Sequence, residues 1–300
     1  MRKALALSLI LTLIPFASTG ATAVKMQSLK PATVIPLSAD PNDQVSTLIV
    51  SPTSIVVAGT SAGDGFLTSF DKTGLRIDWS LRLGGTSDDI VTTAIKDIAG
   101  NYWVAGASAQ LPETQSVALI PPGALNPSGV TPETTTAIAA LTQLDLWKVS
   151  TKGVLLKSYF TTMNNVILPQ GISVKSGIIT VNGVIASQPS DHFTISLGAD
   201  GTFESPVIAS VKNSTIVATK DVKTKLSIWK SFVTSTAIKG LPTWKPKPNS
   251  NVLIRYNLNT KAVVAAYLSS RQILDFTWEK SLGIVALLSN SAGYSLAIIK

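Results

Sequence analysis

Short runs of alternating apolar and polar residues recur along the chain, and turn residues bound each of them. Four of these runs lead into hairpin turns, at residues 71–74, 150–153, 198–201 and 257–260, and a second run follows each turn. Alternation with a period of two places the apolar side chains on one face of a strand. Three of the four turns end in Gly, which adopts a positive φ without a Cβ clash. The pattern predicts an all-β chain built from antiparallel hairpins.

A second set of apolar runs supplies one more strand for each hairpin. We expect these strands at residues 54–61, 101–108, 177–184, 214–220 and 283–289. The hairpin strands are then the third and outermost strands of four-stranded antiparallel blades, and the last blade lacks its outermost strand.

A spare strand at residues 33–37 can complete that last blade beside residues 296–298. Such pairing removes an exposed sheet edge and closes the ring of a β-propeller. Pro36 suits an outermost strand, which can spare one N–H. Chain length alone would also fit six blades, and the hairpin count favours five.

Two segments fall outside this repeat, at about residues 109–136 and 225–250. Both are expected between the second and third strands of a blade. Connections at that position project from the same face as the loop around residues 84–89, and loops on one face of a rigid scaffold commonly carry binding sites. The alternative is that they only cover the channel or apolar rims.

The N-terminal segment has the features of an export signal. Arg2 and Lys3 precede an apolar stretch at 4–17, and Ala21-Thr22-Ala23 suits a cleavage site. We therefore expect a signal peptide over 1–23, with an uncleaved anchor as the alternative, and a single domain over 24–300. No later stretch predicts a transmembrane helix, so we expect a protein that is secreted or held at the cell surface. We also expect it to be a monomer.

Composition narrows the chemistry. The chain has no Cys, which excludes disulfides and thiolate metal sites. Without Arg2 and Lys3 it keeps 23 basic and 17 acidic residues, a net charge of +6. The basic residues form no clustered stripe of the kind that nucleic-acid binding requires. A weak attraction to anionic polymers remains, beside the simpler interpretation that the charge serves solubility.

Residues 64–108 resemble the bacterial SBBP repeat, which occurs in exported proteins and is named for a seven-bladed propeller. The matching residues are Asp64, Phe66, Asp71, Gly74, Trp79, Gly84, Gly85, Asp89, Gly100, Asn101 and Gly106. The resemblance implies an exported propeller and assigns no catalytic residues. Our expectation of five blades differs from the seven in the family's name.

The second of the two segments interleaves aromatic and basic residues. Trp229, Lys230, Trp244, Lys245 and Lys247 are the candidate binding residues. Trp rings can stack on sugar faces, and Lys attracts phosphate or carboxylate groups. The alternative is that both Trp rings pack into the propeller rim and the lysines are simply solvated.

Asp88 and Asp89 are the acidic candidates. They could ligate Ca²⁺ with loop carbonyls, although the sequence favours a loop that hydrogen-bonds its own backbone, and no cofactor is expected. His192 is the only histidine, and no nucleophile motif accompanies it.

These features favour a non-catalytic binding or scaffold propeller that engages an anionic envelope polysaccharide or a surface protein. The alternative is a glycan hydrolase or lyase that uses carboxylates at the channel mouth. A third hypothesis is a structural assembly factor of the envelope.

Overall fold

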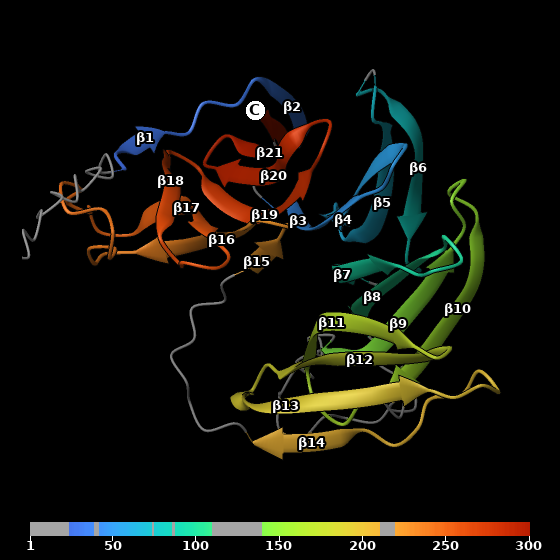
Figure 1. The fold of residues 1–300 in the computed structure, drawn as a ribbon. Helices are drawn as coiled ribbons and strands as arrows, with labels where there is room; N and C mark the ends of the chain where they lie inside the picture. Colours follow the sequence, from blue (N-terminus) through green and yellow to red (C-terminus); the bar gives the residue numbers. More distant parts are fainter. Residues whose placement is uncertain (1–23, 39–41, 74, 86–87, 110–139, 211–219) are drawn as a thin grey trace, which may run out of the picture.

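The computed structural model describes residues 24–38, 42–73, 75–85, 88–109, 140–210 and 220–300. Every regular element in these ranges is a β-strand, and the strands form five sheets (Figure 1). No described segment forms an apolar helix long enough to cross a membrane. The expected signal peptide lies outside the described residues.

Each sheet is one propeller blade, and we number the blades I to V along the chain. Blade I contains β3 (Gln44–Val50), β4 (Ser54–Ser61), β5 (Asp64–Asp71) and β6 (Ile77–Leu83). Blade II contains β7 (Asp89–Lys96), β8 (Tyr102–Ala109), β9 (Leu141–Val149) and β10 (Leu155–Thr162). Blade III contains β11 (Ile167–Lys175), β12 (Ile178–Ile185), β13 (Gln188–Leu197) and β14 (Val207–Ser210).

Blade IV contains β15 (Lys220–Lys223), β16 (Ser227–Thr234), β17 (Ser250–Asn257) and β18 (Val263–Ser269), and β1 (Met26–Ser28) is added to it. Blade V contains β19 (Gln272–Glu279), β20 (Gly283–Asn290), β21 (Gly293–Ile299) and, as its outermost strand, β2 (Thr33–Ser38). The chain is therefore an all-β propeller with five blades, as the hairpin count predicted.

The N-terminal segment completes the C-terminal blade in the predicted register. Val34 pairs with Ala297, and Ile35 pairs with Leu296. A second pairing was not foreseen, because β1 runs parallel to β18 on the outer edge of blade IV. The segment thus joins the outer edges of two blades and covers both.

In three blades a glycine of the second strand lies close to a β-bulge in the innermost strand. A Cβ atom on Gly106 of β8 would lie 1.9 Å from the carbonyl oxygen of Ile90 in β7. The same close approach recurs at Gly59 in β4 and Gly183 in β12, at 2.1 and 2.3 Å from backbone carbonyl oxygens. A bulge pushes the backbone toward its partner strand, so only Gly fits there.

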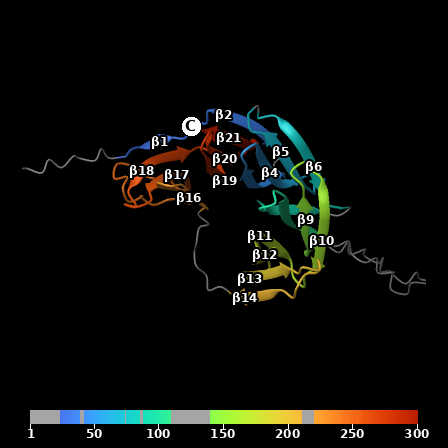
Figure 2. The same cartoon turned by 45° about the vertical axis from the view of Figure 1, so that its right-hand side comes forward.

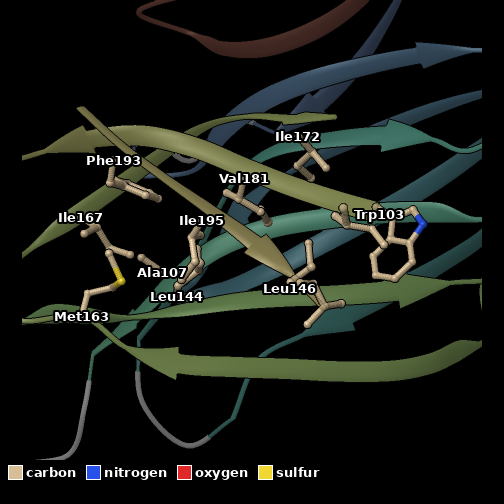
Figure 3. Packing of buried hydrophobic residues seen from close by; sticks show 13 residues of the cluster. Trp103, Ala107, Leu144, Leu146, Met163, Ile167, Ile172, Val181, Phe193 and Ile195 are labelled. Atoms are coloured by element: carbon tan, nitrogen blue, oxygen red, sulfur yellow. The ribbon is translucent and has the colours of Figure 1, made fainter. Parts of the chain in front are cut away.

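Apolar side chains fill the spaces between neighbouring blades. Trp103 and Leu146 of blade II pack with Val181 and Phe193 of blade III (Figure 3). Full burial of one such side chain contributes about 1.5–3 kcal/mol. Since these clusters lie between sheets, each blade is stabilised largely by its neighbours.

The second strand of blade IV differs from the prediction. Residues 214–220 were expected to form it, but that strand is β16, inside the segment 225–250 that the sequence suggested was an insertion. Residues 214–219 lie outside the described part, and Lys220 begins β15. The two runs are similarly apolar, and tertiary packing selects β16 because Ile228 and Trp229 are both buried.

The remainder of that segment, residues 235–249, folds back onto blade IV. Leu241 is 1% exposed and packs with Val252, Ile254 and Ala266, and Trp244 packs against the same cluster. Side chains of the N-terminal segment join them. The face of blade IV turned away from blade V is therefore covered by the chain's own residues.

Because its own chain covers this face of blade IV, the ring of blades is interrupted between blades III and IV. Strands of blades I and II, II and III, IV and V, and V and I contact one another, whereas the described strands of blades III and IV make no comparable contact. Figures 1 and 2 show these two blades apart. The free face of blade III mixes the polar residues Thr180, Asn182 and Thr194 with the exposed apolar residues Leu168, Ile178 and Val207.

Candidate functional site

One face of the propeller carries the connections between second and third strands and the connections between successive blades. We call it the insertion face, because the second strands β8 and β16 both end there, ahead of the two long connections to β9 and β17. Residues 110–139, which hold nearly all of the first expected insertion, lie outside the described part of the chain. The loop with Gly84 and Gly85 joins blades I and II on the same face.

A pocket of about 400 Å³ opens on this face at the outer part of blade V. Its polar lining includes Ser38, Arg271, Asn290 and Tyr294, from β2, the connection between blades IV and V, and the β20–β21 hairpin. Its remaining lining residues are Val34, Pro36, Leu37, Ala292, Gly293 and Ser295. The strand exchange at the N-terminus therefore builds one wall of the pocket.

Arg271 is the only charged residue in this lining. Its Nη1 donates a hydrogen bond of 2.8 Å to Oγ of the buried Ser295, and its backbone N–H donates one of 3.1 Å to Oγ of Ser269. No described acidic group forms an ion pair with it. The guanidinium is held in place and keeps N–H donors for an external acceptor, and its planar fork suits a carboxylate.

A second pocket of about 250 Å³ lies between blades IV and V. It is lined by Ser231, Phe232, Val233, Asn251, Gln272, Ile273 and Leu274. Gln272 follows Arg271 directly, so the two pockets adjoin consecutive residues of one connection. Neither pocket has an Asp or Glu in its lining.

Trp229 is a core residue, and the expectation of an exposed stacking ring is wrong. Its side chain is 8% exposed and belongs to the apolar cluster between blades IV and V. Its ring stacks on Tyr267 with the ring centroids 6.3 Å apart. The guanidinium carbon of Arg255, which pairs with Trp229 from the neighbouring strand β17, lies 5.7 Å from the Trp229 centroid. The neighbouring Lys230 forms an ion pair of 2.7 Å with Asp221. Trp229 and Lys230 make these contacts because both lie on β16.

Trp244 lies in the loop over blade IV and is half-buried against the apolar cluster there. Lys245 and Lys247 are exposed on either side of a proline. The backbone N–H of Lys247 donates to Oγ of Ser250 at 3.1 Å, which ties the end of this loop to β17. Of the five candidates in this segment, these two lysines are exposed, Lys230 and Trp244 are half-buried, and Trp229 is buried.

Asp88 and Asp89 differ in their surroundings. Asp88 is exposed, whereas Asp89 is 3% exposed and its Oδ2 accepts the backbone N–H of Gly85 at 2.7 Å. A Cβ atom on Gly84 would lie 2.3 Å from that same oxygen, which accounts for the glycine. Asp89 thus does what the sequence favoured, since it binds the loop's own backbone. The described residues contain no group of three or more His, Cys, Asp or Glu placed to hold a metal.

Sequence reasoning missed two buried residues beside Asp89. The hydroxyl of Ser108 hydrogen-bonds Asp89 and also Asp145, whose other carboxylate oxygen accepts Nε2 of Gln143 at 2.9 Å. Burial raises the pKa of Asp145 to about 6, and the charge of Asp89 adds to this effect. No local signal in the sequence marks Asp145, because it occupies a polar position in the alternating run of β9.

Comparison with known proteins shows that the chain is similar to several solved structures in fold. No family model and no curated protein matches the chain. Among solved structures it is similar to the Neurospora crassa Pan2 WD40 domain, with 11% identity, 89% of this chain and 81% of that chain covered, and a TM-score of 0.42. An exo-β-1,3-galactanase from Phanerochaete chrysosporium has 9% identity, coverage of 88% and 64%, and a TM-score of 0.40.

The Dos1 propeller is a third similar structure, with 9% identity, coverage of 86% and 68%, and a TM-score of 0.35. At such identities and scores nothing about ligands or chemistry carries over from any of them. The order and pairing of its own strands make the chain a five-bladed β-propeller whose C-terminal blade contains the N-terminal strand.

Proposed function

We propose that the protein is an exported binding propeller without catalytic activity, and that its insertion face takes an acidic envelope glycan. The observation that carries the proposal is Arg271, which Ser295 holds in the lining of the 400 Å³ pocket with no acidic partner among the described residues. A uronic acid presents a carboxylate for the guanidinium and an apolar ring face for Tyr294.

Charge at longer range supports the same ligand class. Lys245 and Lys247 are exposed in the loop of the insertion face, and the chain without its first 23 residues has a net charge of +6. Such a field attracts a polyanion before the specific contacts form, and salt screens it. The proposed binding therefore has a salt-sensitive part and a part specific to Arg271.

The hydrolase alternative gains no support from the site. It requires two carboxylates that open into one pocket, and neither described pocket on the insertion face has an acidic lining residue. Asp89, one of its two candidates, is buried and occupied by protein donors.

The test compares Arg271→Gln with Arg82→Gln, which removes the same charge from an exposed ion pair on β6. Calorimetric titration uses an oligogalacturonate, a neutral oligosaccharide of equal length and an acidic peptide of polyglutamate. We expect Arg271→Gln to weaken oligogalacturonate binding about 10- to 100-fold, in line with loss of a charge-assisted hydrogen bond of about 1.5–3 kcal/mol. Arg82→Gln should change it less than about twofold.

Three results would contradict the proposal. Equal binding of the neutral oligosaccharide removes the role of charge. Equal affinity of Arg271→Gln and wild type would show that the pocket is not the binding site. Binding of the peptide without the oligogalacturonate replaces the glycan by an acidic protein partner. A retention assay on cell-wall fractions should use Trp244→Ala, because Trp229→Ala would damage the core.

A further inference from the structure

Three buried polar side chains meet at the junction of blades I and II. Asp89 comes from the start of β7, Ser108 from the end of β8 and Asp145 from the middle of β9, and their exposed fractions are 3%, 3% and 6%. The Ser108 hydroxyl lies within hydrogen-bonding distance of one carboxylate oxygen of each aspartate. Their contacts tie blade II to the loop that enters it from blade I.

The number of protons decides whether this arrangement is stable. A serine hydroxyl has one hydrogen to donate, and a carboxylate has none. If both aspartates are ionised, one of the two contacts to Ser108 sets oxygen lone pairs against each other without a proton. One added proton turns that contact into a second hydrogen bond, because a protonated carboxyl can donate to the serine oxygen.

Each aspartate accepts one further hydrogen bond on its second carboxylate oxygen. Oδ2 of Asp89 accepts the backbone N–H of Gly85, and Oδ1 of Asp145 accepts the side-chain amide of Gln143. Burial raises the pKa of Asp145 to about 6, with a smaller contribution from the charge of Asp89.

Other charged groups on the surrounding strands do not neutralise Asp89 and Asp145. Asp64 and Arg82 of blade I pair with each other at 3.1 Å, and Ser38 bonds Asp43. The basic residues of the packed strands lie at the opposite end of the blades and are Lys96, Lys148, Lys157 and Lys175. Asp71 ends β5 at that far end, and Asp88 is exposed. Asp89 is the only charged side chain that shifts the titration of Asp145.

We infer that Asp89 and Asp145 share one proton through Ser108, and that this proton makes the junction of blades I and II a pH-sensitive joint that is firm in acid and weaker at neutral pH. The joint includes the loop at Gly85, the turn at Gly63 and the end of β8, where the N–H of Ala109 donates to the carbonyl of Asp88 at 2.9 Å. The inference does not depend on the proposed ligand.

The sign of the pH dependence follows from linkage. The ordinary pKa of Asp is 3.8, and the folded value for Asp145 is about 6. Between these values the folded protein holds a proton that the unfolded chain releases, so stability falls as pH rises through this window. A difference of about two pKa units corresponds to about a 100-fold change in the unfolding equilibrium constant. Above pH 6 the loss is complete.

The experiment compares wild type with Asp145→Asn, whose amide can donate to Ser108 as the protonated carboxyl does. Unfolding by urea is measured from pH 3.5 to 8, and the difference between the two proteins is the readout, which cancels the other titrating groups. We expect the variant to gain up to about 100-fold in the folded-to-unfolded ratio relative to wild type between pH 4 and 7. Asp88→Asn, at the exposed neighbour, is the control and should follow the wild-type curve.

Two direct measurements on wild type remain if Asp145→Asn does not fold. The ¹³Cγ chemical shift of Asp145 should titrate with a midpoint near 6, and the amides of Gly85 and Ala109 should exchange hydrogen faster, relative to intrinsic rates, above that midpoint. A midpoint near 4, or a difference curve that is flat across the window, overturns the inference. An Asp88→Asn curve that matches Asp145→Asn does so too.

Discussion

The methyl group of alanine cannot be accommodated at position 106. An ideal Cβ there would lie 1.9 Å from the carbonyl oxygen of Ile90 and 3.1 Å from the ring of Trp147. Ordinary contact begins at 3.4 Å, so β7 would have to retreat by about 1.5 Å. The obstacle is backbone in a bulged strand whose hydrogen bonds hold two blades together, and it cannot rotate away as a side chain could.

The expected cost of Gly106→Ala is the difference between two effects. Overpacking costs about 1–3 kcal/mol, and a backbone obstacle places this site at about 3 kcal/mol. Removal of a glycine from the unfolded chain offsets about 0.4–1 kcal/mol. The net loss is therefore about 2 kcal/mol, which lowers the Tm of a domain of this size by roughly 4 to 8 °C.

Thermal unfolding followed by far-ultraviolet circular dichroism measures this loss. Gly85→Ala is the matched control, because a Cβ atom at Gly85 has nothing within 4 Å. It should leave Tm within about 1 °C of wild type. Equal Tm values for Gly106→Ala and Gly85→Ala would refute the link between the bulge and the glycine. The same comparison applies to Gly59 and Gly183, which face equivalent bulges.

Three further predictions concern the cover of blade IV, the contact between blades I and V, and the terminal strand of blade V. Leu241→Ala should cost about 2–4 kcal/mol, because Leu241 is 1% exposed in the cover of blade IV, and an unchanged urea midpoint would show that the loop is no cover. Glu279 accepts hydrogen bonds from Ser281 and pairs with Lys72 of blade I at 2.9 Å, and these contacts lower its pKa from 4.5 to about 2. Its stabilisation is present above pH 4.5 and lost as pH falls toward 2, so the stability curves of wild type and Glu279→Gln should converge there, and a constant gap would contradict this. Ile35→Asp places a charge between β2 and the core of blade V and should speed proteolysis within residues 24–38, and a wild-type cleavage rate would argue against the strand exchange as a structural closure.

The repeat could be recognised from the sequence because its signals are local. Alternation, turn glycines and the spare strand at residues 33–37 predicted the hairpins, the five blades and the pairing of Val34 and Ile35. These signals depend only on which residues tolerate a strand, a turn or an outer edge. The positions with close backbone approach, such as Gly106, were visible as part of the repeat, although their reason was not.

The site was harder to predict, because exposure is a property of tertiary packing. Trp229 and Trp244 are each followed by Lys, yet one lies in a core strand and the other in a loop over it. Arg271 carries no local motif, and it becomes a candidate only because a β21 serine and the N-terminal strand meet beside it. Asp145 became notable only when three strands placed two carboxylates on one hydroxyl.

The amino-acid sequence by itself determined the strand rhythm, the blade count and the exchange of the terminal strand, since each follows from short-range sterics and from the need to pair an edge. Only the tertiary structure decided which of two similar apolar runs entered blade IV, that the loop 235–249 and β1 would cover that blade, and that blades III and IV would stand apart. Those outcomes depend on long-range competition for buried apolar surface, in which several segments of nearly equal hydrophobicity can cover one face and only the packing of the whole chain selects among them.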